Sequence, residues 1–255
     1  MRFIKGIFST LYKLYFVLCF IIAYIIFYPF VYFNLRKAEL HPKAFRIRVI
    51  WVGLLNALGL ILFDVEGKEK IKDEPYIICM NHQSYLDILF AYKVVGKYFF
   101  KFIGKKELLK WPMIGVFFRK GMDIPIDRVN AKSARESLEL SKEALRNGIS
   151  IAIFPEGVIP DNTPQLLPFK NGAFKIALEL NIPILPITFL DNWKRMYGDP
   201  VRFFSSASPG RCRAIVHDPI ITQGMDLMDI GPLRDKVYEV INAPLVEVGY
   251  SKKME

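Results

Sequence analysis

Cysteine and histidine are scarce in this sequence. The 255 residues include three histidines and three cysteines, which are Cys19, Cys79 and Cys212. The cysteines are far apart and odd in number, and none belongs to a Cys-x-x-Cys pair. This usage argues against a disulfide framework and against a zinc site. We therefore expect a reducing compartment.

A nucleophile of the usual serine type is also missing. No Gly-x-Ser-x-Gly sequence occurs, and Ser150 lies inside a run that has the composition of a strand. Cys79 lies in the apolar run "YIICM" and is better explained as a core residue. Any nucleophilic attack is therefore expected from a substrate hydroxyl or a water molecule that the chain activates.

Charge is absent from Leu14 to Leu35, a run long enough to cross a hydrocarbon layer of about 30 Å. A second uncharged run, Val49–Phe63, is short for a full span. A simple spanning helix should have basic residues mainly on one side, but here they flank the first run on both sides. They are Arg2, Lys5, Lys13, Arg36, Lys37, Lys43, Arg46 and Arg48. We expect residues 1–63 to form a helical hairpin that enters one leaflet from the cytoplasmic face, with a single spanning helix as the alternative.

Positive charge exceeds negative charge across the whole chain. There are 35 Lys and Arg against 25 Asp and Glu, which gives a formal net charge of +10. Such a balance indicates an anionic partner. No nucleic-acid-binding module is recognisable, and phospholipid headgroups around the apolar segment explain the charge. We expect a lipid bilayer as the partner and no binding of nucleic acid.

The texture of the sequence changes after Phe63, where the polar segment "DVEGKEKIKDEP" begins. We place a boundary there and expect one α/β domain over residues 64–255. Short apolar runs then alternate with amphipathic ones, which predicts a mostly parallel or mixed sheet flanked by helices. The predicted strands are 76–81, 98–104, 121–127, 150–156, 182–189 and 211–220. The predicted helices are 84–95, 107–118, 131–147 and 172–180.

The segment "MNHQSYLD" (residues 80–87) is the first that indicates chemistry. His82 follows a predicted strand, and Ser84 and Asp87 have the spacing of a capping box that would begin a helix at Ser84. Asp87 would then lie under the loop that holds His82. A carboxylate bonded to one imidazole nitrogen leaves the other nitrogen free to act as a general base. The alternative is a loop histidine without a task beside a residue that only caps the helix.

Two further strand ends carry polar residues. The segment "SIAIFPEGVIP" places Glu156 and Gly157 directly after a predicted strand, where glycine allows close approach of a ligand or an unusual turn. A turn with a surface glutamate is the alternative. Arg128 follows another predicted strand, at the position where ligands collect in α/β folds, and arginine binds phosphate oxygens in pairs. Most lysines of residues 97–110 are better explained by contact with water or headgroups.

Together these segments resemble, in order, the motifs of the glycerolipid acyltransferases, which make phosphatidic acid from lysophosphatidic acid. "NHQSYLD" is similar to the family's NHx4D motif, and "GKKELLKWPMIG" to its lysine-bearing segment. "GMDIPIDR" resembles the second motif, "FPEG" the third, and "FKNGAFKIALELNIPILPITF" the fourth. The resemblance covers about Tyr76 to Phe189. It implies a glycerol-3-phosphate acyltransferase-like fold.

The resemblance also implies a reaction and a set of roles. An acyl group would pass from a thioester of acyl carrier protein or coenzyme A to the free hydroxyl of a lysophospholipid, without an acyl-enzyme. His82 would be the general base and Asp87 would orient it. The implied acceptor-binding residues are Lys105, Arg128, Glu156 and Gly157, with Asn81, Phe154 and Pro155 as motif support. The family needs no metal, so the resemblance implies no cofactor, with the thioester of acyl carrier protein or coenzyme A as a co-substrate.

The third motif departs from the family pattern. It usually continues Thr-Arg-Ser after Glu-Gly, whereas Val158, Ile159 and Pro160 stand here. A hydroxyl and a cation are therefore missing, and Lys170 in "PFKNG" is a candidate to replace the charge. Two alternatives follow: an acyltransferase for another lysolipid or a lyso-aminolipid, and an inactive membrane protein that binds lipid.

Overall fold

The structure is a computed structural model that describes residues 2–111, 114–127, 129–197 and 205–252. Within these ranges seven strands form a single sheet. They are β1 (Ile61–Glu66), β2 (Ile77–Met80), β3 (Phe100–Lys105), β4 (Ile124–Ile126), β5 (Ser150–Ile153), β6 (Ile184–Phe189) and β7 (Gly210–Val216).

The α-helices of the described residues precede, connect and follow these strands. They are α1 (Arg2–Asn34), α2 (His41–Leu58), α3 (Leu86–Val95), α4 (Gly115–Arg119), α5 (Ala131–Arg146), α6 (Gly172–Leu180), α7 (Asn192–Arg195) and α8 (Ile230–Glu247). Short 3-10 helices are η1 (Ala38–Leu40), η2 (Lys68–Lys70), η3 (Lys106–Lys110) and η4 (Leu227–Asp229).

The sheet has the order β1-β7-β6-β2-β5-β3-β4. Strands β6 and β7 run antiparallel, and every other neighbouring pair runs parallel. This confirms the predicted mixed, mostly parallel sheet. Because β2, β3, β4 and β5 are parallel, their carboxyl ends lie along one edge of the sheet.

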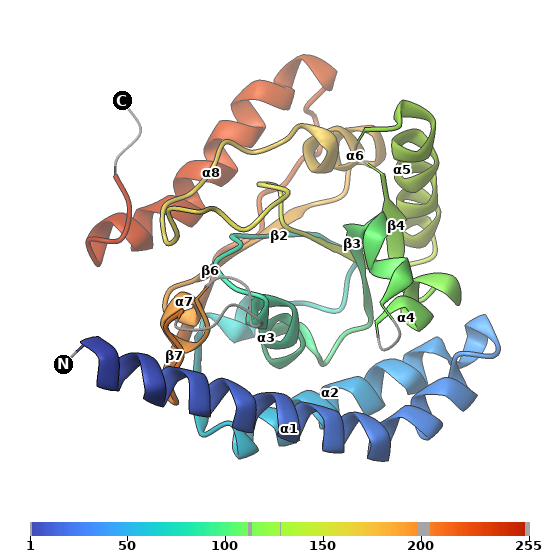
Figure 1. Cartoon of the computed structure of the whole chain (residues 1–255). Helices are drawn as coiled ribbons and strands as arrows, with labels where there is room; N and C mark the ends of the chain where they lie inside the picture. The colour runs from blue at the N-terminus through green and yellow to red at the C-terminus, as the bar shows by residue number, and fades with distance from the viewer. Residues whose placement is uncertain (1, 112–113, 128, 198–204, 253–255) are drawn as a thin grey trace.

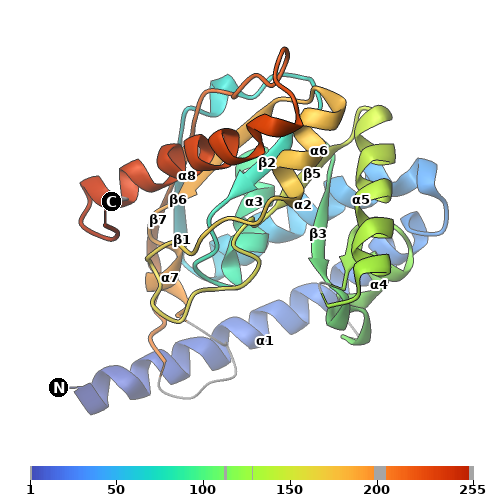
Figure 2. The same ribbon diagram turned by 90° about the horizontal axis from the view of Figure 1, so that it is seen from above.

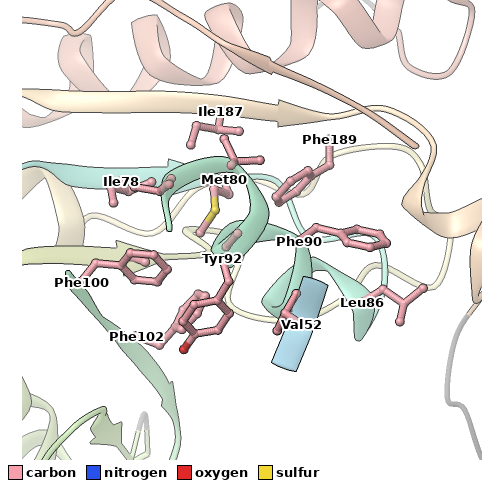
Figure 3. Close-up of a cluster of buried hydrophobic side chains, with 14 of the residues drawn as sticks. Val52, Ile78, Met80, Leu86, Phe90, Tyr92, Phe100, Phe102, Ile187 and Phe189 are labelled. Carbon is pink, nitrogen blue, oxygen red and sulfur yellow. The ribbon is translucent and has the colours of Figure 1, made fainter. Parts of the chain in front are cut away.

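Helices cover both faces of the sheet (Figure 1). Helices α5, α6 and α8 lie on one face, and α3 and α2 lie on the other, with α1 outside α2. Strand β2 has all four residues buried, because Ile78 and Met80 face the α3 side while Ile77 and Cys79 face the other. Figure 3 shows Met80 among the aromatic rings of the α3 side. The prediction of Cys79 as a core residue is confirmed, and burial raises the pKa of its thiol.

Helices α1 and α2 form an antiparallel pair along the outside of the domain (Figure 2). The Tyr12 hydroxyl near the start of α1 donates to the carbonyl of Gly59, just past the end of α2, at 2.7 Å. Helix α1 has 33 residues and is long and apolar enough, by length and composition, to cross a membrane. Its outward face exposes many large apolar side chains, among them Ile4, Phe8, Leu11, Leu18 and Ile25. The two-helix arrangement therefore suits membrane association, and insertion into one leaflet stays a prediction.

A buried ion pair connects the helical pair to the sheet. Arg48 of α2 donates from Nη1 to Oδ2 of Asp123 at 3.1 Å, and both side chains are almost fully buried. The other oxygen of Asp123 accepts the backbone N–H of Phe102 in β3 at 3.0 Å. The guanidinium also lies over the rings of Tyr92 and Phe117. Asp123 directly precedes β4, so this pair joins α2 to two strands at once.

The sequence did not reveal β1. Its pairing with β7 starts at Ile61 and Gly210, so the strand begins before the boundary placed after Phe63 and continues through it. Exposure alternates along β1, with Leu62, Asp64 and Glu66 outward. Its first three residues belong to the uncharged run 49–63, in which the alternation of polar and apolar residues that is typical of a strand is not visible. Helices α7 and α8 were not predicted either.

Two of the predicted helices have different boundaries in the structure. The helix predicted over 107–118 is replaced by η3 and α4, which have five residues each. Pro112 lies between them in the sequence, and proline removes a helical N–H and restricts the residue before it. Helix α3 begins at Leu86 rather than Ser84, which still places Asp87 in its first turn.

Candidate active site

The carboxyl edge of the sheet brings the sequence-predicted residues together. His82 follows β2, and Phe154 to Gly157 follow β5, which is the neighbour of β2. Lys105 is the last residue of β3 on the other side of β5. Ligands in open α/β sheets bind outside the carboxyl ends of strands. This edge is therefore the candidate site.

The imidazole of His82 contacts the carboxylate of Asp87. Nδ1 of His82 and Oδ2 of Asp87 are 2.7 Å apart. A carboxylate can only accept, so Nδ1 carries the proton in this bond and Nε2 of neutral His82 is left with a lone pair. Among the described residues Nε2 has no hydrogen-bond partner, and the side chain is 14% exposed. The predicted pair is thus assembled with the geometry of a general base and its orienting group.

Asp87 is fully buried and has four hydrogen bonds. Its Oδ2 also accepts the backbone N–H groups of Gln83 at 2.5 Å and Ser84 at 2.8 Å. Its Oδ1 accepts from Nδ2 of Asn192 at 2.7 Å. Hydrogen-bond donors therefore contact both oxygens of this buried carboxylate. The bond from Ser84 fits the predicted capping role, because a first-turn carboxylate reaches back to the backbone before the helix.

The ring of His82 is held from a second direction by the segment after β5. It stacks on Phe154 with ring centroids 4.0 Å apart and an angle of 13° between the planes. Pro155 follows, and its carbonyl accepts the backbone N–H of Lys170 at 2.9 Å. Gly157 has a φ of +83°, a conformation that favours glycine and permits the sharp turn.

Glu156 bridges two loops through the backbone. Its Oε1 accepts the N–H of His82 at 2.7 Å, and its Oε2 accepts the N–H of Leu167 at 2.9 Å. Burial raises the pKa of Glu156 to about 8, the two N–H groups oppose that rise, and the charge of Asp87 adds to it. Sequence reasoning predicted that Glu156 shapes the acceptor site. The structure shows both of its oxygens bonded to the chain itself.

Asn81 joins the end of β2 to the end of β6. Its Nδ2 donates to the carbonyl of Phe189 at 2.9 Å, and its Oδ1 accepts the N–H of Phe189 at 2.7 Å. The side-chain amide thereby continues the strand pairing beyond Met80. As a result the chain after β6, which carries Asn192, lies beside the loop that holds His82.

The predicted phosphate-binding residues are less enclosed. Lys105 is exposed, and its Nζ lies 3.9 Å from Oε2 of Glu107. Lys170 is exposed and follows the Glu156 loop. Val158, which stands in the altered third motif, is exposed as well. Arg128 lies outside the described residues.

Sequence reasoning missed Asn192. It is separated from Asp87 by 105 residues, and no motif surrounds it. Its only local signal is its place after the strand that Asn81 engages. In the described part of the chain, no group of three or more His, Cys, Asp or Glu side chains is arranged to hold a metal ion.

Comparisons with known proteins show which family the chain resembles. A family model described as Acyltransferase matches residues 62–190. The chain is 33% identical over 181 residues to 1-acyl-sn-glycerol-3-phosphate acyltransferase BAT2, chloroplastic, of Brassica napus, which covers 70% of this chain and 51% of that protein. It is 32% identical over 195 residues to 1-acyl-sn-glycerol-3-phosphate acyltransferase alpha of Mus musculus, covering 75% of this chain and 67% of that protein.

The chain thus spans about half the length of the plant relative. Among solved structures, the fold is similar to the crystal structure of the 1-acyl-sn-glycerophosphate acyltransferase PlsC from Thermotoga maritima. The TM-score is 0.78, the sequence identity is 25%, and the match covers 100% of both chains. With a family model over half of its length and these relatives, the chain belongs to the acyltransferase family.

Proposed function

We propose that this protein transfers a fatty acyl group from a thioester to the free hydroxyl of lysophosphatidic acid, which gives phosphatidic acid. The observation that carries the proposal is the bond between His82 and Asp87, which leaves Nε2 of His82 free at the carboxyl edge of the sheet. The names of the relatives support lysophosphatidic acid as the acceptor. The donor is a thioester of acyl carrier protein or of coenzyme A.

In the proposed reaction His82 acts twice. Nε2 takes the proton of the acceptor hydroxyl while the hydroxyl oxygen attacks the thioester carbonyl. The tetrahedral intermediate collapses, the carbon–sulfur bond breaks, and the new ester bond remains. The imidazolium then returns its proton to the departing thiolate. Asp87 stabilises the imidazolium between these steps, and attack is direct because the sequence offers no serine nucleophile of its own.

Lys105 and Lys170 are proposed to attract the acceptor phosphate, together with Arg128. The first two are exposed at or after strand ends on the site's edge. Since Val158 replaces a hydroxyl residue in the third motif and is exposed, a second candidate function has a specific basis. In it the acceptor is a lysolipid with a different headgroup or a lyso-aminolipid.

The central experiment uses the purified chain in detergent micelles, with a radiolabelled acyl donor and a panel of lysolipid acceptors. Lysophosphatidic acid should be the best acceptor. The variant His82→Ala should lose several orders of magnitude in rate, because the base is gone. His217→Asn is the matched control, since His217 contacts Thr188, whose hydroxyl donates to the carbonyl of Ile241 in α8 rather than to the loop that holds His82, and it should be dispensable. Wild-type turnover in His82→Ala would refute the mechanism, and absence of any transfer would favour a lipid-binding protein.

We further propose that α1 and α2 hold the site at the cytoplasmic face of the membrane. Support comes from the apolar outward face of α1 and from the basic residues on both sides of it. A tag on the N-terminus of the full chain should be labelled only from the cytoplasmic side of sealed vesicles. Labelling from the opposite side would replace the one-leaflet hairpin with a spanning helix.

A further inference from the structure

Asn192 lies where two strand ends are joined. It is the first residue of α7 and follows β6 by three positions. Asn81 binds the last residue of β6 with both atoms of its amide. The chain after β6 therefore returns across the end of β2, directly beside the loop of residues 81–87.

The amide of Asn192 contacts the carboxylate that orients His82. Nδ2 of Asn192 lies 2.7 Å from Oδ1 of Asp87, and both side chains are fully buried. Because a carboxylate accepts hydrogen bonds, the amide of Asn192 must turn its NH₂ group, and not its oxygen, toward Asp87. Its Oδ1 meets no hydrogen-bond donor among the residues that the structure describes. Within the described part of the chain, the side chain of Asn192 thus makes one hydrogen bond, which it donates to Asp87.

Helix α7 is held firmly despite its four residues. Asp191, directly before it, accepts two hydrogen bonds from Arg213 of β7 at 2.6 and 3.1 Å. Lys194 lies 3.2 Å from the same carboxylate. The carbonyl of Met196, just after α7, accepts the hydroxyl of Ser84 at 2.7 Å. Two bonds therefore join α7 to the loop of residues 81–87, and ion pairs fix α7 to the sheet.

We propose that Asn192 is a positioning residue for the acyl transfer, which acts on the catalytic base through Asp87. This inference rests on the proposed function, because it assigns a role toward His82. Three donors share Oδ2 of Asp87, whereas Oδ1 has Asn192 as its one donor among the described residues. The amide thereby prevents the carboxylate from turning away from Nδ1 of His82. It also supplies a hydrogen-bond donor to a carboxylate that is buried near Glu156 and Cys212.

The main test removes the donor without adding a titratable group. Asn192→Leu should lower kcat by about tenfold or more, because a hydrogen bond to a buried charged group is lost. The acceptor KM should stay within about twofold, since Asn192 does not reach the acceptor. Asn242→Leu is the matched control. Asn242 is also buried, also donates its Nδ2 to one acceptor and also has an unbonded Oδ1 among the described residues, but its acceptor is the carbonyl of Lys252.

A second variant separates positioning from simple structural support. In Asn192→Asp, a protonated carboxyl can donate to Asp87 as the amide does, whereas an ionised carboxyl repels it. The activity of this variant relative to wild type should therefore fall as pH rises from about 6 to about 9. A purely structural residue would give a constant ratio. Thermal unfolding in detergent identifies any variant that has lost its fold, and the isosteric Asp variant then decides.

The results of these experiments test the role of Asn192 separately from the proposed acyl transfer. A wild-type kcat in Asn192→Leu, or a ratio that does not change with pH in Asn192→Asp, would overturn the role of Asn192 while His82→Ala remains inactive. If the wild-type chain transfers no acyl group, or if His82→Ala keeps full activity, the proposed function itself fails. Loss of kcat in Asn192→Leu alone, with Asn242→Leu unaffected and folded, supports the inference.

Discussion

Oε1 of Glu156 lies 2.7 Å from the backbone nitrogen of His82. The other oxygen of the same carboxylate accepts the N–H of Leu167, so one side chain fixes two loops relative to each other. The histidine is therefore held at three places: its backbone by Glu156, its Nδ1 by Asp87 and its ring face by Phe154. Such fixed geometry is what a general base requires before substrate arrives.

The variant Glu156→Gln tests this bridge. Glutamine has one acceptor oxygen, and its NH₂ group would face one of the two backbone N–H donors. We expect kcat to fall by about tenfold, because an oxygen that accepts a backbone N–H beside the base is replaced by an NH₂ group that repels it. The KM values for donor and acceptor should change less. Steady-state kinetics measure both, with Glu143→Gln on the exposed side of α5 as control. Unchanged kcat would show that the bridge does not support catalysis.

Glu156 should also make stability depend on pH. A glutamate in an unfolded chain titrates near about 4.3, whereas burial raises the pKa of Glu156 to about 8 in the folded protein. Between these values the folded state binds more protons than the unfolded state, so the free energy of unfolding falls as pH rises. Thermal unfolding in detergent should show the Tm of wild type falling relative to that of Glu156→Gln over this window. Parallel curves would contradict the raised pKa.

The contact between His82 and Asp87 could be predicted from the sequence because the two residues are close in the chain. His82 and Asp87 are five residues apart, and a strand end followed by a helix start fixes their relation. The strands from β2 to β7 and the helices α3, α5 and α6 were also readable from alternating apolar runs. The capping pattern misplaced the start of α3 by two residues, yet this did not disturb the pair.

The rest of the site depends on contacts between distant segments. The bond from Asn192 to Asp87 crosses 105 residues, and the two bonds of Asn81 with Phe189 cross 108. No local pattern encodes such pairs, because they follow from which strands are neighbours in the sheet. Strand β1 was missed because of its local composition rather than because of a distant contact. Its residues Ile61 to Phe63 continue an apolar run that has its own explanation in α2.

Lys105 offers a test of acceptor recognition. We expect Lys105→Ala to raise the KM for lysophosphatidic acid by about tenfold with little change in kcat, since an exposed cation contributes to binding of the phosphate rather than to the chemistry. Lys110→Ala is the control, because it removes the same charge from the exposed end of η3. The two variants should be compared at low and at moderate salt. Equal KM values in both would attribute any effect to net charge.

The ion pair between Arg48 and Asp123 predicts that the helical pair and the sheet unfold together. Asp123→Asn leaves the guanidinium buried without its counter-charge, which costs about 3 kcal/mol in comparable buried pairs. We expect a clear drop in Tm in detergent. Asp218→Asn removes an exposed partner of Lys70 and should leave Tm unchanged.

The double variant Arg48→Met with Asp123→Leu shows whether the drop comes from the charge or from packing. If an unpaired buried charge causes the loss, removal of both charges should restore much of the Tm, because apolar groups can replace a buried pair at little cost. The rings of Tyr92 and Phe117 already surround the site of the guanidinium and would accommodate methionine. If the double variant is as unstable as Asp123→Asn, its instability comes from loss of the hydrogen bond that the N–H of Phe102 donates to Asp123, which asparagine can keep and leucine cannot. In that case the connection between β3 and the start of β4 limits the stability of the double variant.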